Sequence, residues 1–257
     1  LLLFVLYFFE INFLASYITI YDGFAPFVEN VHQIVRVLIF IPFLNLFLAT
    51  SFKLNKYLKF FLIINTIIVA YLILETNSFK GQLSLLISCV FFIFVFLLKK
   101  IKFDNFIKIL FTISLFLILI IYFSELLHNL FIENDGDDIR KILYINALFT
   151  STTNLFLGHG AGILLLIENN YYEAHNTLLS ILIQSGIVPF ILFIIFFLKL
   201  LIKLYNNIFL FSSLIASTPY ILGGDILRNI QFWFFLYLLV YFNNFLKKEN
   251  YLKKVNS

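Results

Sequence analysis

Charged residues are scarce in this chain of 257 residues: they make up 12% of it, whereas 62% of the residues are apolar and the mean hydropathy is +1.00. Soluble globular proteins carry about 25% charged and roughly 45–50% apolar residues, so this balance excludes a soluble protein. The sequence contains no basic patch interleaved with aromatic residues, so we do not expect nucleic acid as a partner. The net charge of +4 fits lysines that anchor the chain against anionic lipid. We therefore expect an integral membrane protein whose partners include membrane lipids.

Methionine is absent and cysteine occurs once. The chain lacks Met at position 1 and begins inside an apolar run with no charged n-region or cleavage site, so we expect an N-terminally incomplete copy without a signal peptide. Cys89 lies within another apolar run and has no partner for a disulfide in the chain. We interpret Cys89 as a small core residue.

Patterns of metal ligands are missing as well. The sequence has no His-x-x-x-His, no cysteine cluster and no paired carboxylates outside the Asp-Gly-Asp-Asp run at 135–138. That run lacks the twelve-residue spacing of a calcium loop, which favours a solvated acidic turn over a Ca²⁺ site. We predict no metal and no other cofactor.

Several apolar runs are long enough to cross a membrane, whose hydrocarbon core of roughly 30 Å requires about 17–25 helical residues. Helices are expected because lipid cannot satisfy open backbone groups, and the alternation of barrel strands is absent. The sequence predicts an all-α fold, a polytopic transmembrane helical bundle that forms a single integral membrane domain over residues 1–257. The predicted spans lie near Leu1–Tyr21, Val31–Ala49, Leu58–Leu74, Leu83–Leu98, Phe106–Ser124, Thr177–Phe197, Ile208–Leu222 and Ile230–Phe245.

Lysines concentrate in every second connection between these spans, and acidic residues concentrate in the others. Because cationic residues mark cytoplasmic loops, the lysine-rich connections predict the cytoplasmic side, and the C-terminus falls on that side. The longest of the other connections, residues 125–176, therefore faces outward. The predicted cytoplasmic lysines are Lys53, Lys56, Lys59, Lys99, Lys100, Lys102, Lys108, Lys199, Lys203, Lys247, Lys248, Lys253 and Lys254.

All arginines of the chain, Arg36, Arg140 and Arg228, fall on the predicted outer side. The planar guanidinium suits phosphate better than the point charge of lysine does. The asymmetry favours a phosphate site on the outer face, and a general coding preference for lysine is the alternative. Arg36, at the outer end of the second span, and Arg228, in the last outer turn, are either substrate contacts or surface anchors.

The outward loop divides into two parts. Asp138–Phe156 predicts an amphipathic helix at the outer membrane interface, with Arg140 near its start. The Gly-His-Gly-Ala-Gly run at 158–162 follows, and its glycines permit either a sharp turn or the close approach of main-chain amides to an anion. The turn is favoured because the run matches no phosphate-loop pattern. The predicted apolar face of the helix combines Ile139, Ile142, Leu143, Ile145, Ala147, Leu148 and Phe149.

His175 stands just before an apolar run that begins at Leu178, with Asn176 or Thr177 available as the N-cap. A helix start at the membrane surface favours anions and holds side chains rigidly. An imidazole titrates near neutral pH and can take a proton from a sugar hydroxyl. His175 is therefore either a polar cap or a general base.

Four elements follow one another in a recognisable order. They are Asn-Ser-Phe-Lys-Gly at 77–81, Arg140 before a short helix, the Gly-His-Gly-Ala-Gly run, and AHNTLLSILIQSGIVPF at 174–190. This order resembles the O-antigen ligase and O-antigen polymerase family of bacterial inner-membrane glycosyltransferases, which typically has Ser-Arg-Gly at the first element. The likeness covers residues 30–245 and implies further N-terminal helices, in agreement with the absent Met.

The resemblance implies a glycan donor carried on undecaprenyl diphosphate and an acceptor that is lipid A-core or another glycan. It implies a multi-pass protein of the bacterial cell inner membrane with a cytoplasmic C-terminus. Residues 125–176 would be the periplasmic loop that carries the active site. His175 would deprotonate the acceptor hydroxyl, which attacks the anomeric carbon with inversion and without a metal.

The same resemblance assigns the remaining site residues. Lys80 stands where the family has an arginine that contacts the lipid diphosphate, and Arg140 supplies a second contact. Arg36 and Arg228 are further candidates for diphosphate binding. The residues that we expect to support the site are Asn176, His159, Gly158 and Gly160.

Other functions stay open at this point. An O-antigen polymerase uses the same donor as a ligase and differs in its acceptor, and a protein O-oligosaccharyltransferase is a third relative. A lipid-linked oligosaccharide flippase or transporter, from another class, would use Glu10 and the intramembrane residues Asn12, Asn45 and Asn65. The long outward loop favours an enzyme, since we see no inverted repeat or paired broken helices of the kind many transporters show.

Overall fold

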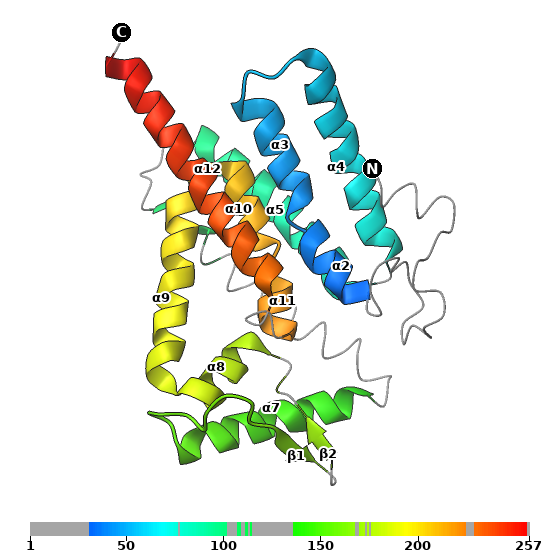
Figure 1. Ribbon diagram of the computed structural model, residues 1–257, viewed down its shortest axis with the longest axis vertical. Coiled ribbons are helices and arrows are strands. Elements are labelled where there is room, and N and C mark those ends of the chain that lie inside the picture. Colours follow the sequence, from blue (N-terminus) through cyan, green and yellow to red (C-terminus); the bar gives the residue numbers. More distant parts are fainter. Residues whose placement is uncertain are drawn as a thin grey trace. The chain divides into compact units, whose positions relative to one another are not determined.

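The computed structural model describes residues 31–76, 78–101, 107–108, 111–112, 114, 136–167, 170–172, 174, 176–224 and 229–255. These residues are mostly helical (Figure 1). They fall into two compact units. The first unit lies within 1–93, 203–220 and 227–257, and the second lies within 94–202 and 221–226.

The first unit begins with a helix that breaks once. Helices α2 (Val31–Leu38) and α3 (Ile41–Ser51) together contain one candidate membrane span, Ile34–Ser51. Pro42 explains the break because proline lacks an amide donor and its ring clashes with the carbonyl four residues earlier. At the break, the Phe40 carbonyl accepts from both the Leu44 amide at 3.2 Å and Ser213 Oγ at 3.1 Å.

The other helices of the first unit pack around α3. Helix α4 (Lys56–Glu75) lies beside it and starts at Asn55, whose side chain accepts from the Leu58 amide at 2.8 Å. Helices α10 (Ile208–Ile215) and α12 (Ile230–Val255) close the unit, and the rings of Phe40 and Phe235 stack with their centroids 4.8 Å apart. The part of α5 (Phe79–Lys100) up to Ile93 and the part of α11 (Thr218–Gly223) up to Tyr220 complete it.

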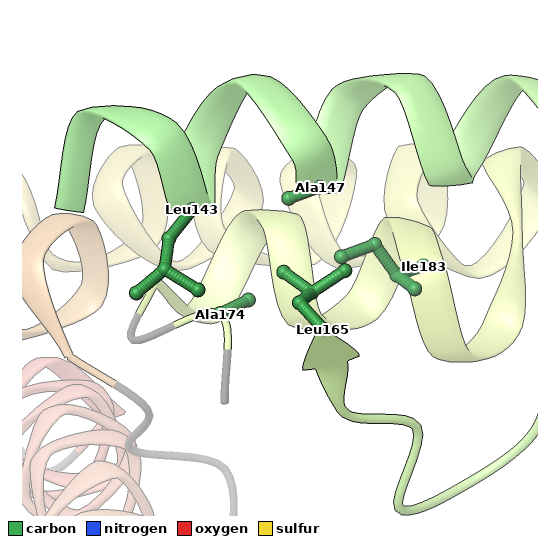
Figure 2. Close-up of a cluster of buried hydrophobic side chains, with 5 residues drawn as sticks. All are labelled: Leu143, Ala147, Leu165, Ala174 and Ile183. Carbon is green, nitrogen blue, oxygen red and sulfur yellow. The ribbon is translucent and has the colours of Figure 1, made fainter. Parts of the chain in front are cut away.

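The second unit contains helix α7 (Gly136–Thr153), a hairpin of strands β1 (Leu165–Ile167) and β2 (Asn170–Tyr172), and helices α8 (Thr177–Ser185) and α9 (Ile187–Leu204). The strands pair antiparallel, with Leu165 opposite Tyr172. One side of α7 packs on α8 and β1. Figure 2 shows the resulting apolar cluster of Leu143, Ala147, Leu165, Ala174 and Ile183, all buried.

Four described helices are long and apolar enough to cross a membrane: Ile34–Ser51, Lys56–Glu75, Phe79–Lys100 and Ile187–Leu204. The second and third coincide with the predicted spans Leu58–Leu74 and Leu83–Leu98 and confirm a helix in each place, whereas the predicted span Val31–Ala49 is divided into α2 and α3. Helix α12 starts at Ile230 as predicted and extends past Phe245. The predicted span Leu1–Tyr21 and most of Phe106–Ser124 lie outside the described residues.

The prediction of one helix over Thr177–Phe197 is wrong. The chain turns at Gly186, whose φ is +84°, and α9 then runs on to Leu204. Pro189 suits the first turn of α9, where its missing amide donor costs nothing.

Two other expectations need correction. The predicted span Ile208–Leu222 is two short helices, α10 and α11, because Pro219 cannot donate to the carbonyl four residues earlier. The fold is also not purely helical among the described residues, since the loop contains the β1–β2 hairpin. The helix predicted at Asp138–Phe156 is confirmed as α7, although it ends at Thr153. Only part of its predicted apolar face is buried, because Ile142, Ile145, Leu148 and Phe149 are exposed.

Candidate functional site

In the first unit, the start of α5 packs directly against α2. A Cβ added at Gly81 would overlap Cγ1 of Val35, so no larger residue fits without a shift in the neighbouring helix. Lys80 precedes Gly81 and Arg36 follows Val35 in the chain. Arg36 and Lys80, two residues predicted to bind the diphosphate, therefore lie on two helices that touch. Each of them is next in sequence to a residue of the contact between Val35 and Gly81. Both side chains are partly exposed.

Tyr220 of α11 completes this part of the site. Its side chain is 1% exposed, and the Arg36 guanidinium lies over its ring, with 5.9 Å between Cζ and the ring centroid. The tyrosine hydroxyl is 3.3 Å from Oγ of buried Ser78, which also accepts from the Gly81 amide at 3.3 Å. Tyr220 thus connects the arginine on α2 with the residue that precedes α5. We refer to the contacting residues Arg36, Tyr220 and Ser78, together with Lys80 at the start of α5, as the cationic cluster.

In the second unit, the Gly-His-Gly-Ala-Gly run forms a turn whose amides are used within the protein. The amides of Gly158, His159 and Gly160 donate to the carbonyls of Asn154, Ile183 and Gln184 at 2.9, 2.7 and 2.9 Å. Gly158 has φ +70°, and a Cβ there would overlap the backbone of Gln184. The run therefore joins the end of α7 to the end of α8, and these three donors do not point to an anion.

The His159 side chain closes the C-terminus of α7. Its Nε2 lies 2.8 Å from the Thr150 carbonyl and 3.0 Å from Thr153 Oγ1. A carbonyl can only accept, so Nε2 donates to Thr150. This contact satisfies a terminal carbonyl of the helix, which is a positioning role for an exposed histidine.

Asn176 holds the start of α8 through both ends of its amide group. Its Oδ1 accepts from the amides of Leu178 and Leu179 at 3.0 and 3.1 Å, and its Nδ2 donates to the Leu222 carbonyl at 2.6 Å. Thr177 Oγ1 donates to the Gly224 carbonyl at 2.6 Å. Of the two predicted N-cap candidates, Asn176 is confirmed as the cap, and its side chain also ties the start of α8 to the Leu222 carbonyl in the same unit.

The remaining predicted site residues are less fully described. His175 and Arg228 lie outside the described residues. Arg140 belongs to α7, and its side chain lies outside the described part of the structure. Ala174, which precedes His175, is buried in the apolar cluster of Figure 2, so the chain on both sides of the histidine is fixed.

Two residues of the cationic cluster were not among the predicted site residues. Ser78 lies in the Asn-Ser-Phe-Lys-Gly element, but nothing in the sequence connects it with Tyr220, 142 positions later. Within the described residues, no group of three or more His, Cys, Asp or Glu side chains is arranged to hold a metal ion.

A comparison with protein families gives one match. The family model described as O-antigen ligase matches residues 64–194, which is half of the chain. The matched range contains Lys80, Arg140, the glycine-rich turn and the pair His175–Asn176. No curated protein and no solved structure gives a significant match.

Proposed function

Because the chain belongs to the O-antigen ligase family, we propose that it transfers a glycan from undecaprenyl diphosphate to a hydroxyl of lipid A-core. The reaction takes place at the periplasmic face of the bacterial inner membrane. It proceeds with inversion and needs no metal. The observation that carries this proposal is the cationic cluster, in which Arg36 and Lys80 lie on two helices in direct contact.

The chemistry of the donor explains why cations are needed. When the sugar leaves undecaprenyl diphosphate, negative charge grows on the diphosphate, and fixed cations in a partly dry site stabilise that charge most. Each charge-assisted hydrogen bond contributes about 1.5–3 kcal/mol. Lys80 and Arg140 make the principal contacts in this proposal, and Arg36 and Arg228 add to them.

His175 takes the proton from the acceptor hydroxyl. The oxygen then attacks the anomeric carbon on the side opposite the departing diphosphate. The double anchoring of Asn176 supports this role, because a general base must be held within hydrogen-bond reach of its proton. The buried position of Ala174 restricts the chain on the other side.

A genetic experiment tests the reaction class. The gene is expressed in a strain that lacks its own copy, as wild type, as His175→Ala and as the control Tyr171→Ala, which changes an exposed side chain of the hairpin, and surface polysaccharide is examined on gels. Loss of attached chains in His175→Ala, with accumulation of lipid-linked polymer and normal glycan in Tyr171→Ala, supports a ligase. A single-repeat pattern indicates an O-antigen polymerase of the same family. Normal surface glycan in His175→Ala contradicts the assigned base.

A further inference from the structure

The turn that follows α7 exposes three consecutive apolar side chains. Leu155, Phe156 and Leu157 are 38%, 73% and 81% exposed, and together we call them the apolar tip. We propose that the apolar tip inserts into the acyl chains of the membrane leaflet that borders the start of α9. The tip anchors the turn and α8 at the membrane surface. This role is separate from the proposed glycan transfer and does not depend on it.

The position of the tip beside α9 sets its depth. The Ile187 amide donates to the Leu155 carbonyl at 2.7 Å, and a Cβ at Gly186 would overlap the Phe156 carbonyl. Helix α9 is a candidate span of 18 residues. Such a helix rises about 27 Å, which is less than the roughly 30 Å of a hydrocarbon core. Ile187 therefore lies at or inside the hydrocarbon edge, and so does the backbone of the tip.

The backbone around the tip suits a medium without water. In lipid, polar backbone groups must find partners within the protein. The Gly158 amide donates to the Asn154 carbonyl, and the Asn154 side chain donates back to the Gly158 carbonyl. The amides of His159 and Gly160 donate to carbonyls of α8. These bonds pair the backbone groups that flank the tip, so those groups need no water where the turn meets the lipid edge.

Charge and surface agree with this placement. No Asp, Glu, Lys or Arg stands between Lys141 and Glu168, whereas about a quarter of the residues in a soluble protein are charged. The first turns of α9 also expose apolar side chains, with Val188 at 55% and Leu192 at 60%. Because Ile187 is bonded to Leu155, the tip continues the lipid-facing surface of this candidate span.

A tryptophan reporter tests the proposal. The chain has one tryptophan, so Trp233→Phe gives a silent background. Phe156→Trp is the reporter, and the matched control is Tyr171→Trp, which replaces a side chain 70% exposed on the hairpin. Each full-length variant is reconstituted into phosphatidylcholine vesicles whose acyl chains carry bromine. We expect blue-shifted emission at position 156 and quenching at least threefold stronger than at position 171.

Three results would overturn the proposal. Red-shifted emission at position 156 without quenching would place the tip in water. Blue-shifted emission without quenching would show that protein, such as a second copy of the chain, covers the tip. Equal quenching at positions 156 and 171 would mean that the tip is not the inserted part.

A second pair of variants tests whether the apolar side chains of the tip cause its insertion into the membrane. With Leu157→Trp as reporter, Phe156→Asp should abolish quenching, since a carboxylate draws the turn out of the lipid. Tyr171→Asp in the same reporter should leave quenching unchanged. Quenching that persists in Phe156→Asp would contradict the proposal, because other parts of the protein would then set the depth.

Discussion

The ring of buried Tyr220 lies under the guanidinium of Arg36, with 5.9 Å between Cζ and the ring centroid. A cation over an aromatic face is stabilised by about 0.5–2 kcal/mol, more when it is shielded from water. The tyrosine hydroxyl meets Ser78 at 3.3 Å, so the ring is held at its far end as well. This arrangement fixes one of the candidate diphosphate ligands.

Replacement of Tyr220 by Phe and by Ala should separate the contribution of its bond to Ser78 from that of its ring under Arg36. Tyr220→Phe keeps the ring under Arg36 and loses the bond to Ser78, so we expect a loss of about 1 kcal/mol. Tyr220→Ala empties a fully buried site and should cost about 3–5 kcal/mol. Thermal unfolding in detergent micelles measures both. Equal melting temperatures for Phe and Ala variants would contradict the packing described for this ring.

Gly81→Ala should destabilise the protein by about 1–3 kcal/mol, because the added Cβ overlaps Val35 Cγ1. Val35→Ala removes that atom. The double variant should therefore be more stable than the sum of the single effects predicts, and a double-mutant cycle on unfolding measures the difference. Strict additivity would show that α5 and α2 do not touch at this point.

The two glycines of the turn should respond differently to alanine. Both have positive φ, +70° at Gly158 and +92° at Gly160, so each substitution carries a strain of roughly 1–2 kcal/mol. At Gly158 the new Cβ also overlaps the backbone of Gln184, whereas nothing lies within 4 Å at Gly160. Gly158→Ala should lower the melting temperature clearly more than Gly160→Ala. The reverse order would contradict the turn geometry.

Asn176→Ala should loosen the start of α8. Loss of the N-cap costs about 0.5–2 kcal/mol, and the Leu222 carbonyl loses its donor in addition. Asn176→Asp keeps the oxygen that caps the helix but loses the amide donor to Leu222. The amide protection of this variant should lie between those of wild type and Asn176→Ala. Hydrogen exchange at the Leu178 and Leu179 amides measures the effect. Unchanged protection in Asn176→Ala would show that the cap does not hold the helix.

Local patterns in the sequence predicted much of the fold. The long apolar runs at 58–74 and 83–98 predicted α4 and α5, and the periodicity of 138–156 predicted α7. The N-cap at Asn176 was equally visible, since a polar residue precedes an apolar run. These features depend on neighbours within a few turns of the chain, which a single sequence displays.

Features that depend on distant contacts were missed. A Cβ at Gly186 would overlap the Phe156 carbonyl, thirty residues earlier, and no pattern in the sequence displays this close approach. The hairpin was overlooked because its strands are only three residues long. The pairing of Ser78 with Tyr220 joins positions too far apart for any spacing rule. The roles of His175, Lys80, Arg36, Arg140 and Arg228 stay predictions.

The central claim is that His175 acts as the base for glycan transfer while Lys80 grips the donor diphosphate. The most direct test is a kinetic assay with purified protein, an undecaprenyl-diphosphate-linked glycan and lipid A-core. We expect His175→Ala to lower kcat by about 10²–10⁴ without changing donor binding, and Tyr171→Ala to leave kcat near wild type. Lys80→Gln should raise the donor KM, and Lys80→Arg should restore it. A wild-type kcat in His175→Ala, or a wild-type donor KM in Lys80→Gln, would contradict the account.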